Sequence, residues 1–267
     1  MQKEDFLRPS TVVTILLLII LFVVLISGCS LLRCPTASKL PPPESMLQPL
    51  SMSVDRILMD ETQRLSDIAL SDAAQKAEWR GIKEQLTDGK KKRVGALYWY
   101  ALPDGSYYTS DKDRVSANLR SRSYFSVVLA GHIVAGKSVI GKTSGRKSII
   151  VAVPIKKGDE VTGVLGTSFY AEDFCYYLST IVDLPAEYNF YAVNSEGVTI
   201  FNLKECDLTF DHPLEQNAPS FVDAMERILA SSRGEVSYKW NGAFKKAIYQ
   251  RSSVSGWTYV ISIPVKS

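Results

Sequence analysis

The stretch that decides the fold runs from Leu119 to Tyr170, with LRSRSYFSVVLAG at its start and SVIGKTSGRKSIIVAVPIKKGDEVTGVLGTSFY at its end. It opens on Arg120 and Arg122 beside the aromatic pair Tyr124 and Phe125, and three short apolar runs punctuated by glycine follow. This pattern is typical of a helix that leads into antiparallel strands. The predicted helix and strands cover residues 122–131, 138–142, 148–156 and 162–170. We interpret the stretch as the wall of a small-molecule pocket.

The composition excludes several classes of function. A chain of 267 residues with 46% hydrophobic and 22% charged residues is ordinary for a globular protein of one large or two small domains. The net charge of +3 is too small to indicate a nucleic-acid partner, since only the run from Lys90 to Arg93 concentrates it. The two histidines, His132 and His212, have no cysteine or histidine partner at metal-ligand spacing. We therefore expect no metal site and no cofactor.

Residues 1–28 have the pattern of a bacterial lipoprotein signal peptide. Lys3 and Arg8 precede an apolar run over residues 11–26, which is short for a membrane span of about 20 residues. The run ends in Ile26-Ser27-Gly28-Cys29, which resembles a lipobox. The resemblance implies cleavage before Cys29 and attachment of lipid, including palmitate, at that residue. The domain would then lie at the periplasmic face of a bacterial membrane, and the alternative is an uncleaved signal anchor.

A linker and a long helix are expected next. Residues 29–44 include Pro35 and the triplet Pro41-Pro42-Pro43, a composition that favours an extended spacer. Residues 45–90 then show apolar side chains at helical spacing, with a possible break near Asp72. The apolar stripe of this helix fits two arrangements, a coiled coil with a second copy or packing along its own domain.

The remainder contains one order of elements twice. A strand over residues 94–102 and the turn Pro103-Asp104-Gly105 predict a hairpin, which precedes the helix and three strands described above. A second hairpin, helix and set of three strands follow. They are expected at residues 188–193, 198–203, 220–230, 234–240, 243–251 and 257–264. We therefore predict an α+β fold of two modules, residues 91–184 and 185–267, each a central antiparallel sheet with flanking helices.

Two cysteines fall in or near the predicted folded elements. An extracytoplasmic location would permit a disulfide between Cys175 and Cys206. The same spacing is equally compatible with two separately buried thiols. The sequence leaves both alternatives open.

In this order the motifs resemble a double Cache sensor domain, in which a long helix precedes a membrane-distal and a membrane-proximal PAS-like module. The motifs that carry the resemblance are Pro103-Asp104-Gly105, the segment from Leu119 to Phe125 with Gly131, Ala152-Val153-Pro154, Gly163-Val164-Leu165-Gly166 and Gly256-Trp257. The resemblance implies an extracytoplasmic sensor whose distal module holds a small ligand.

The resemblance also assigns positions in the ligand site. Arg122 and Tyr124 fall where amino-acid-binding members carry an arginine and an aromatic residue, and Phe125 lies beside them. A guanidinium offers bidentate donors to a carboxylate, which suits an anionic ligand. Those members also carry an aspartate that pairs with the ligand amine, and the matching position here is Ser168. Because that counter-charge is missing, we expect a small carboxylate rather than an amino acid.

Two further residues are candidates for the site. Tyr100 is assigned to the pocket, although in a regular strand only one of the pairs Tyr98/Tyr100 and Leu97/Trp99 can face it. Lys142 is the second candidate, as a partner for an anion. The competing interpretation makes Lys142 an exposed turn residue and places Arg122 on the surface, paired with Asp111 or Asp113.

No local arrangement of serine, histidine and acidic residues indicates a catalytic site, so we do not expect an enzyme. The sequence favours a lipid-anchored binding protein that serves signal transduction through a separate transmembrane receptor, kinase or cyclase, or that serves uptake. The alternative is a structural or interaction module of the cell envelope that binds no metabolite.

Overall fold

The computed structural model describes residues 40–88 and 94–265. The predicted signal peptide, the lipidation site at Cys29 and most of the predicted linker lie outside these residues, as does the basic run from Lys90 to Arg93. Within the two described ranges, no helix is both long enough and apolar enough to cross a membrane.

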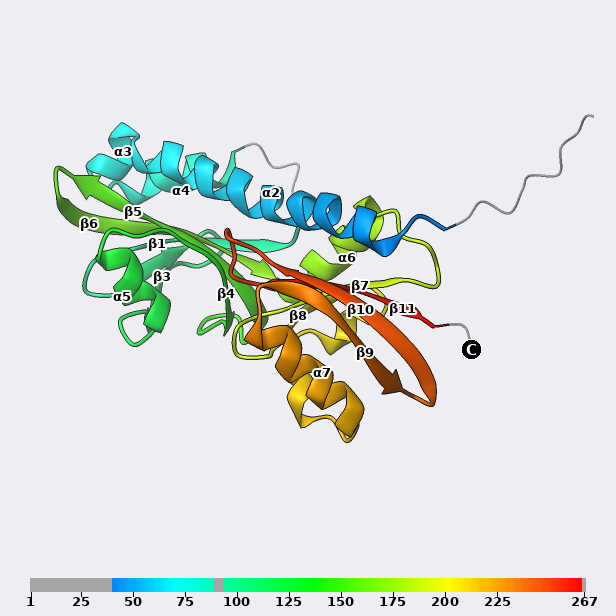
Figure 1. The fold of residues 1–267 in the computed structure, drawn as a ribbon. Helices are drawn as coiled ribbons and strands as arrows, with labels where there is room; N and C mark the ends of the chain where they lie inside the picture. The colour runs from blue at the N-terminus through cyan, green and yellow to red at the C-terminus, as the bar shows by residue number, and fades with distance from the viewer. Residues whose placement is uncertain (1–39, 89–93, 266–267) are drawn as a thin grey trace, which may run out of the picture. The chain divides into compact units, whose positions relative to one another are not determined.

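The described chain has the expected α+β fold, with an N-terminal helical region followed by two antiparallel sheets (Figure 1). The helices are α2 (Pro43–Ala69), α3 (Asp72–Gln75), α4 (Trp79–Thr87), α5 (Ser123–Leu129), α6 (Ala171–Ile181) and α7 (Pro219–Ala230), with 3-10 turns η1 (Cys206–Leu208) and η2 (Pro213–Glu215). The strands of the first sheet are β1 (Ala96–Ala101), β2 (Ser106–Thr109), β3 (Asp113–Asn118), β4 (Val134–Ile140), β5 (Lys147–Lys157) and β6 (Glu160–Tyr170). The strands of the second sheet are β7 (Asn189–Val193), β8 (Thr199–Asn202), β9 (Arg233–Trp240), β10 (Ala243–Arg251) and β11 (Thr258–Pro264).

The N-terminal helical region is broken twice and not once. Ser71 ends the first helix because its backbone is extended and its hydroxyl accepts a hydrogen bond of 3.3 Å from the Ala74 amide, which caps α3. Ala77 then takes a positive φ of 57°, which separates α3 from α4. The first helix also begins earlier than expected, at Pro43, since a proline in the first turn needs no hydrogen-bond donor.

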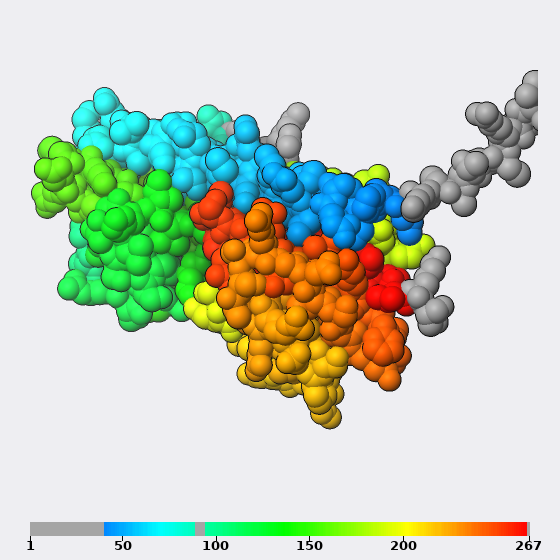
Figure 2. All heavy atoms as spheres, in the orientation of Figure 1, coloured from blue at the N-terminus to red at the C-terminus, as the bar shows by residue number. Residues whose placement is uncertain are grey.

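Helix α2 lies along both sheets of its own domain and joins them (Figure 1). Its carboxylate Asp55 accepts hydrogen bonds of 2.6 Å from the Tyr259 hydroxyl and 2.8 Å from the Ser252 hydroxyl, both in the second sheet region. Its carboxylate Glu61 accepts a hydrogen bond from Thr167 of the first sheet. In the space-filling view, α2 runs above both the green and the orange parts of the chain (Figure 2). Of the two arrangements left open, packing along the domain is therefore the one observed.

The first sheet has the strand order β3-β2-β1-β6-β5-β4, with α5 on one face and α2 on the other. Strand β5 is a nearly continuous apolar run because both of its faces are covered. Strand β3 was not predicted, since its sequence DRVSAN forms a polar, largely exposed edge without apolar alternation. We call residues 94–184 the distal module.

The second sheet has the order β8-β7-β11-β10-β9, and α7 covers the face opposite α2. Its strands begin and end within two residues of the predicted limits, because the turns between them carry clear glycine and asparagine signals. We call residues 185–265 the proximal module.

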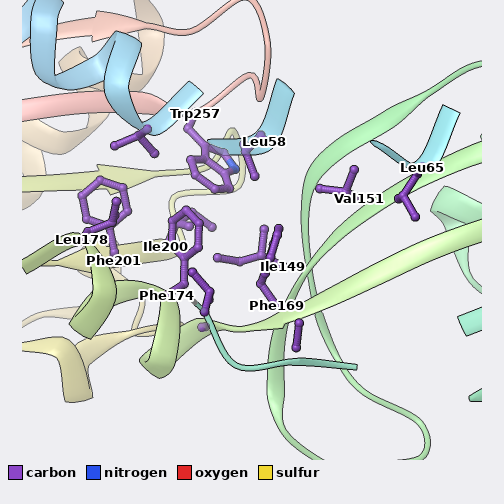
Figure 3. Close-up of a cluster of buried hydrophobic side chains, with 14 of the residues drawn as sticks. Leu58, Leu65, Ile149, Val151, Phe169, Phe174, Leu178, Ile200, Phe201 and Trp257 are labelled. Carbon is purple, nitrogen blue, oxygen red and sulfur yellow. The ribbon is translucent and has the colours of Figure 1, made fainter. Parts of the chain in front are cut away.

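The core beneath α2 is continuous between the modules (Figure 3). In the close-up, Leu65 of α2 lies near Val151 of the distal module, Phe201 lies in the proximal module, and Phe174 and Trp257 lie between them. Full burial of such side chains contributes about 1.5–3 kcal/mol each. The opposite faces of the two sheets carry separate apolar clusters, under α5 and α7, and each of the two cavities described below lies beside one of them.

Cys175 of α6 and Cys206 of η1 form a disulfide, with their Cα atoms 5.6 Å apart. Of the two alternatives left open by the sequence, the bond is the one observed. It ties the helix that connects the modules to the segment that follows β8.

Candidate functional site

A cavity of about 30 Å³ lies on the α5 side of the distal sheet. Strands β1, β5 and β6 provide its floor, α5 and the residues before it provide one wall, and the end of β4 with the following turn covers it. The residues that line it are Leu97, Trp99, Tyr107, Leu119, Arg122, Tyr124, Val139, Gly141, Lys142, Thr143, Ser144, Ile150 and Ser168.

Four of the six residues assigned from the sequence meet at this cavity. They are Arg122, Tyr124, Lys142 and Ser168, which come from three separate parts of the distal module. Phe125 lies directly beneath them, fully buried in the apolar cluster, and does not form the lining. The alternation of side chains along β1 places Tyr100 on the other face of the sheet.

Tyr100 is therefore a correction to the sequence-based assignment. Its ring packs in the cluster under α2 and α4, stacked on Trp79 at 6.4 Å and on Tyr108 at 6.1 Å between ring centroids. Leu97 and Trp99 face the cavity instead. Because side chains alternate along a strand, Tyr98 and Tyr100 then face the opposite side of the sheet.

Trp99 forms much of the cavity floor, and a glycine of β6 makes room for it. A Cβ atom on Gly166 would lie 2.0 Å from the Trp99 ring, so only glycine allows the indole to lie against this strand. The indole nitrogen then donates a hydrogen bond of 3.1 Å to the Ser168 hydroxyl. The Gly-Val-Leu-Gly motif of the sequence thus positions a side chain that the sequence analysis did not assign.

Arg122 precedes the first residue of α5, and its guanidinium donates a hydrogen bond to the carbonyl of Ile140 at the end of β4. The surface pairing with Asp111 or Asp113 is not the contact observed. Asp113 instead accepts hydrogen bonds of 2.7 Å from Lys83 and 2.8 Å from Trp79, and these donors lower the pKa of its carboxyl. The hydrogen bond to the Ile140 carbonyl therefore holds the Arg122 guanidinium beside the cavity.

Lys142 lines the cavity from the turn after β4, and it is exposed there, as the competing interpretation expected. Its ammonium donates hydrogen bonds of 2.6 Å to the Asn118 carbonyl and 2.7 Å to the Ser121 hydroxyl. One residue further along, the Thr143 hydroxyl bonds to the hydroxyl of Tyr107. Together with the contact from Arg122, these bonds fasten residues 140–143 over the cavity.

The electrostatic character of the cavity is cationic. Arg122 and Lys142 are lining residues, and no aspartate or glutamate lines the cavity in the part of the chain that the structure describes. Burial raises the pKa of the Tyr124 hydroxyl, so this group remains a neutral hydrogen-bond donor at physiological pH. These groups suit an anion, since each of them can donate to an oxygen and none carries a negative charge.

Metal binding has no support in residues 40–88 and 94–265, where no group of three or more histidine, cysteine, aspartate or glutamate side chains gathers.

The chain matches no family model and no curated protein, whereas several solved structures share its fold. The ligand-binding domain of the Pseudomonas aeruginosa PAO1 amino acid chemoreceptor PctB, in complex with L-Arg, is 15% identical, with 83% of this chain and 93% of that chain covered and a TM-score of 0.66. The ligand-binding domain of the Pseudomonas fluorescens chemoreceptor CtaA, in complex with L-alanine, is 15% identical over 83% and 95%, with a TM-score of 0.65. That of the Campylobacter jejuni chemoreceptor Tlp3, with 4-methylisoleucine, is 13% identical over 82% and 88%, with a TM-score of 0.62.

At these identities the likeness concerns the fold. It confirms that the chain has the fold of a double Cache sensor domain, with an N-terminal helix and two antiparallel sheets. All three neighbours are ligand-binding domains of chemoreceptors.

Proposed function

We propose that the distal module binds a small carboxylate and that the chain acts as a ligand-binding sensor domain. The observation that carries this proposal is the convergence of Arg122 and Lys142 on one cavity whose described lining contains no acidic side chain. The fold supports it, since the neighbouring domains from PctB, CtaA and Tlp3 belong to chemoreceptors.

The proposed binding step is an exchange of hydrogen-bond acceptors. Arg122 now donates to the Ile140 carbonyl, and Lys142 donates to the Asn118 carbonyl and the Ser121 hydroxyl. A ligand carboxylate would replace these neutral acceptors, and charge-assisted bonds are roughly twice as strong as neutral ones. The aromatic rings of Trp99 and Tyr124 would exclude water from the contact.

The distal cavity is too small for a metabolite unless part of its lining moves. A cavity of about 30 Å³ has room for about one or two water molecules, so a metabolite can enter only if residues 140–144 move outward. These residues begin at the last residue of β4, and this strand also contacts the proximal module through Gly136. Ligand binding would therefore bias the packing of the two modules, and a partner protein could detect the change.

The same residues define the proposed selectivity. An α-amino acid would place its ammonium in a cavity that already holds Arg122 and Lys142, with the neutral Ser168 on the floor. Like charges at such distances disfavour binding unless a carboxylate intervenes. A carboxylate without an amine avoids this repulsion.

We also propose that the chain is a lipoprotein anchored through Cys29. Cleavage at the lipobox and lipid on Cys29 would hold the domain at the periplasmic face of a membrane, where a receptor, kinase or cyclase could carry its signal. Mass spectrometry of the mature amino terminus tests this part, because an intact Met1 is incompatible with lipoprotein processing.

A thermal-shift comparison of matched ligands tests the binding proposal. The full chain in detergent is titrated with propionate and succinate, and with L-alanine and L-aspartate, which add only an ammonium. A carboxylate at about 100 times its Kd should raise the melting temperature by roughly 5–10 °C for a domain of this size. The amino acids should give a smaller shift at the same concentration.

The matched variants are Arg122→Ala and Arg120→Ala. Both remove one arginine from the same short segment, but Arg120 is exposed and does not line the cavity. At the same ligand concentration the shift should fall to about half or less in the first variant and persist in the second. A shift that survives unchanged in Arg122→Ala removes this site assignment.

The second candidate function is a structural or interaction module that binds no metabolite. The closely packed distal cavity favours it, since three hydrogen-bonded connections already hold residues 140–143 in place. Absence of any shift with a broad set of carboxylates, with slow hydrogen exchange at residues 140–144, would support this alternative.

A further inference from the structure

A second and larger cavity lies in the proximal module, on the α7 side of its sheet, with a volume of about 260 Å³. We propose that this cavity is a separate binding site for a small zwitterion that carries an apolar or aromatic body. The site differs from the distal cavity in its residues, its module and the charge of its lining.

The register of the sheet brings the polar floor of this cavity together. Asn189 of β7 pairs with Ser262 of β11, which pairs with Ala247 of β10, and Lys245 lies two residues along β10 on the same face. Lys245 pairs in turn with Tyr238 of β9. Because side chains alternate along each strand, these four residues lie on one face of the sheet in two adjacent rows, Asn189 with Ser262 and Lys245 with Tyr238.

Asn189 points to a ligand because it lines the cavity and its amide oxygen, itself buried, has no hydrogen-bond partner among the residues that the structure describes. Leaving such an acceptor unpaired costs about 1–3 kcal/mol, whereas a donor from a ligand removes the cost. An N–H group of a bound molecule is the natural partner. This orphaned oxygen is the observation that distinguishes the cavity from an ordinary surface hollow.

Three aromatic rings form one wall of the cavity, and they favour a ligand with an apolar or aromatic part. Phe221 of α7 packs on Tyr238 at 5.2 Å and on Trp240 at 4.7 Å between ring centroids, and all three rings line the cavity. An apolar cavity of about 150 Å³ is large enough to bind benzene. A volume of 260 Å³ therefore accommodates a ring together with a polar group.

The charged side chains that line the cavity suggest a ligand with both a positive and a negative group. Lys204 and Lys245 face the cavity together with Glu205 and Asp211, so the positive and negative side chains balance. Burial lowers the pKa of Lys245, with a further contribution from Lys204, and the Glu205 carboxylate partly offsets both effects. A zwitterion satisfies such a lining, whereas the two cations of the distal cavity favour a carboxylate alone.

The segment that closes this cavity is fixed at two points. Cys206 holds its beginning to α6 through the disulfide, and the carbonyl of Thr209 accepts a 2.6 Å hydrogen bond from Lys147 of the distal module. The cavity is therefore bounded by a segment held in place, and not by a free loop.

Calorimetric titration of the full chain with three matched probes tests the proposal. The probes are L-phenylalanine, 3-phenylpropanoate, which lacks the amine, and 2-phenylethylamine, which lacks the carboxylate. We expect L-phenylalanine to bind at least tenfold more tightly than either of the others. Equal affinity for all three, or no detectable binding of L-phenylalanine, overturns the proposal.

Variants locate the binding. Asn189→Leu and Lys245→Met should each weaken L-phenylalanine binding at least tenfold, whereas Lys239→Met, on the exposed side of β9, and Arg122→Ala, in the distal cavity, should leave it unchanged. Asn189→Leu removes a buried group that has no partner, so its melting temperature should not fall, and lost binding cannot be attributed to unfolding. Binding that is unaffected by both proximal variants, or that is lost in Arg122→Ala, contradicts the assignment.

Discussion

The indole nitrogen of Trp257 donates a hydrogen bond of 2.9 Å to the backbone carbonyl of Gly136, and the two residues belong to different modules. Gly136 has a φ of +94° and sits where the register of β4 shifts against β5. The next two residues of β4 also bond to the proximal module, Lys137 to Glu196 and Ser138 to Asn194. Strand β4 therefore connects the module junction directly to the carbonyl that Arg122 holds at the distal cavity.

The junction can be tested by adding one methyl group. A Cβ atom on Gly136 would lie 3.1 Å from the Trp257 ring, so Gly136→Ala combines a strained positive φ with overpacking. Gly145→Ala is the matched control, since Gly145 also has a positive φ but, among the described residues, no atom lies within 4 Å of its added Cβ. We expect a loss of about 2–4 kcal/mol for the first and about 1–2 kcal/mol for the second. Urea unfolding measures both, and equal losses would show that the junction is not tightly packed.

Several features of this architecture follow directly from local sequence patterns. The two hairpins and the order of strands in the proximal module agree with the residue limits expected from periodicity and turn residues. The apolar stripe predicted an N-terminal helix but not its start at Pro43 or its two breaks. Strand β3 was missed because an edge strand needs only backbone pairing, and its polar side chains carry no alternating pattern.

The residues of the two candidate sites were harder to predict from the sequence than the strands and helices. Arg122 and Tyr124 precede and begin one short helix, so a local motif could place them together. The period of two could not decide whether Trp99 or Tyr100 faces the cavity, because both faces of the sheet are covered. The proximal cavity draws its residues from five strands and the segment before α7, and no short motif unites them.

The disulfide should contribute strongly to stability. Cys175 and Cys206 are separated by 31 positions, and a loop of that length gives about 3–4 kcal/mol of stabilisation in the chain-entropy model. We expect the double variant Cys175→Ser/Cys206→Ser to lower the melting temperature by roughly 6–15 °C. Reduction of the unmodified protein should reproduce this loss. A change below about 2 °C in both experiments would mean that the bond adds little to folding.

The buried tyrosines predict a loss of stability at alkaline pH. Burial raises the pKa of Tyr191 and of Tyr259 well above the usual value, and the nearby Asp55 carboxylate adds to the effect at Tyr259. The unfolded chain loses these protons near pH 10 while the folded chain retains them, so stability is complete below about pH 10 and falls above it. Each tyrosine contributes about 1.4 kcal/mol per pH unit in that window.

The test of this dependence is the slope of stability against pH between about 10 and 11. Tyr191→Phe should flatten the slope by about 1 kcal/mol per pH unit, because the unfolded phenol is only partly ionised between pH 10 and 11. Tyr176→Phe, in which the removed hydroxyl belongs to a side chain that is 59% exposed, serves as the control for the substitution itself. Identical slopes for the two variants would contradict the assignment of the alkaline loss to buried phenols.

Ser168 offers a way to change the preference of the distal cavity. Ser168→Asp places a carboxylate on its floor, which repels a ligand carboxylate but provides a counter-charge for a ligand amine. We expect the ratio of L-alanine affinity to propionate affinity to rise at least tenfold. Ser168→Asn, which has similar size and no charge, should leave the ratio near its original value. A ratio that is unchanged in Ser168→Asp would place the ligand elsewhere.

The central claim is that Arg122 binds the carboxylate of a small ligand in the distal cavity. The most direct measurement is calorimetric titration of the full chain, Arg122→Ala and Arg120→Ala with the carboxylate that gives the largest thermal shift. Loss of a hydrogen-bonded charge of this kind costs about 1.5–3 kcal/mol, so Arg122→Ala should bind roughly 10- to 150-fold more weakly, with Arg120→Ala unchanged. Affinity of Arg122→Ala within twofold of the original protein, or an equal loss in both variants, would contradict the claim.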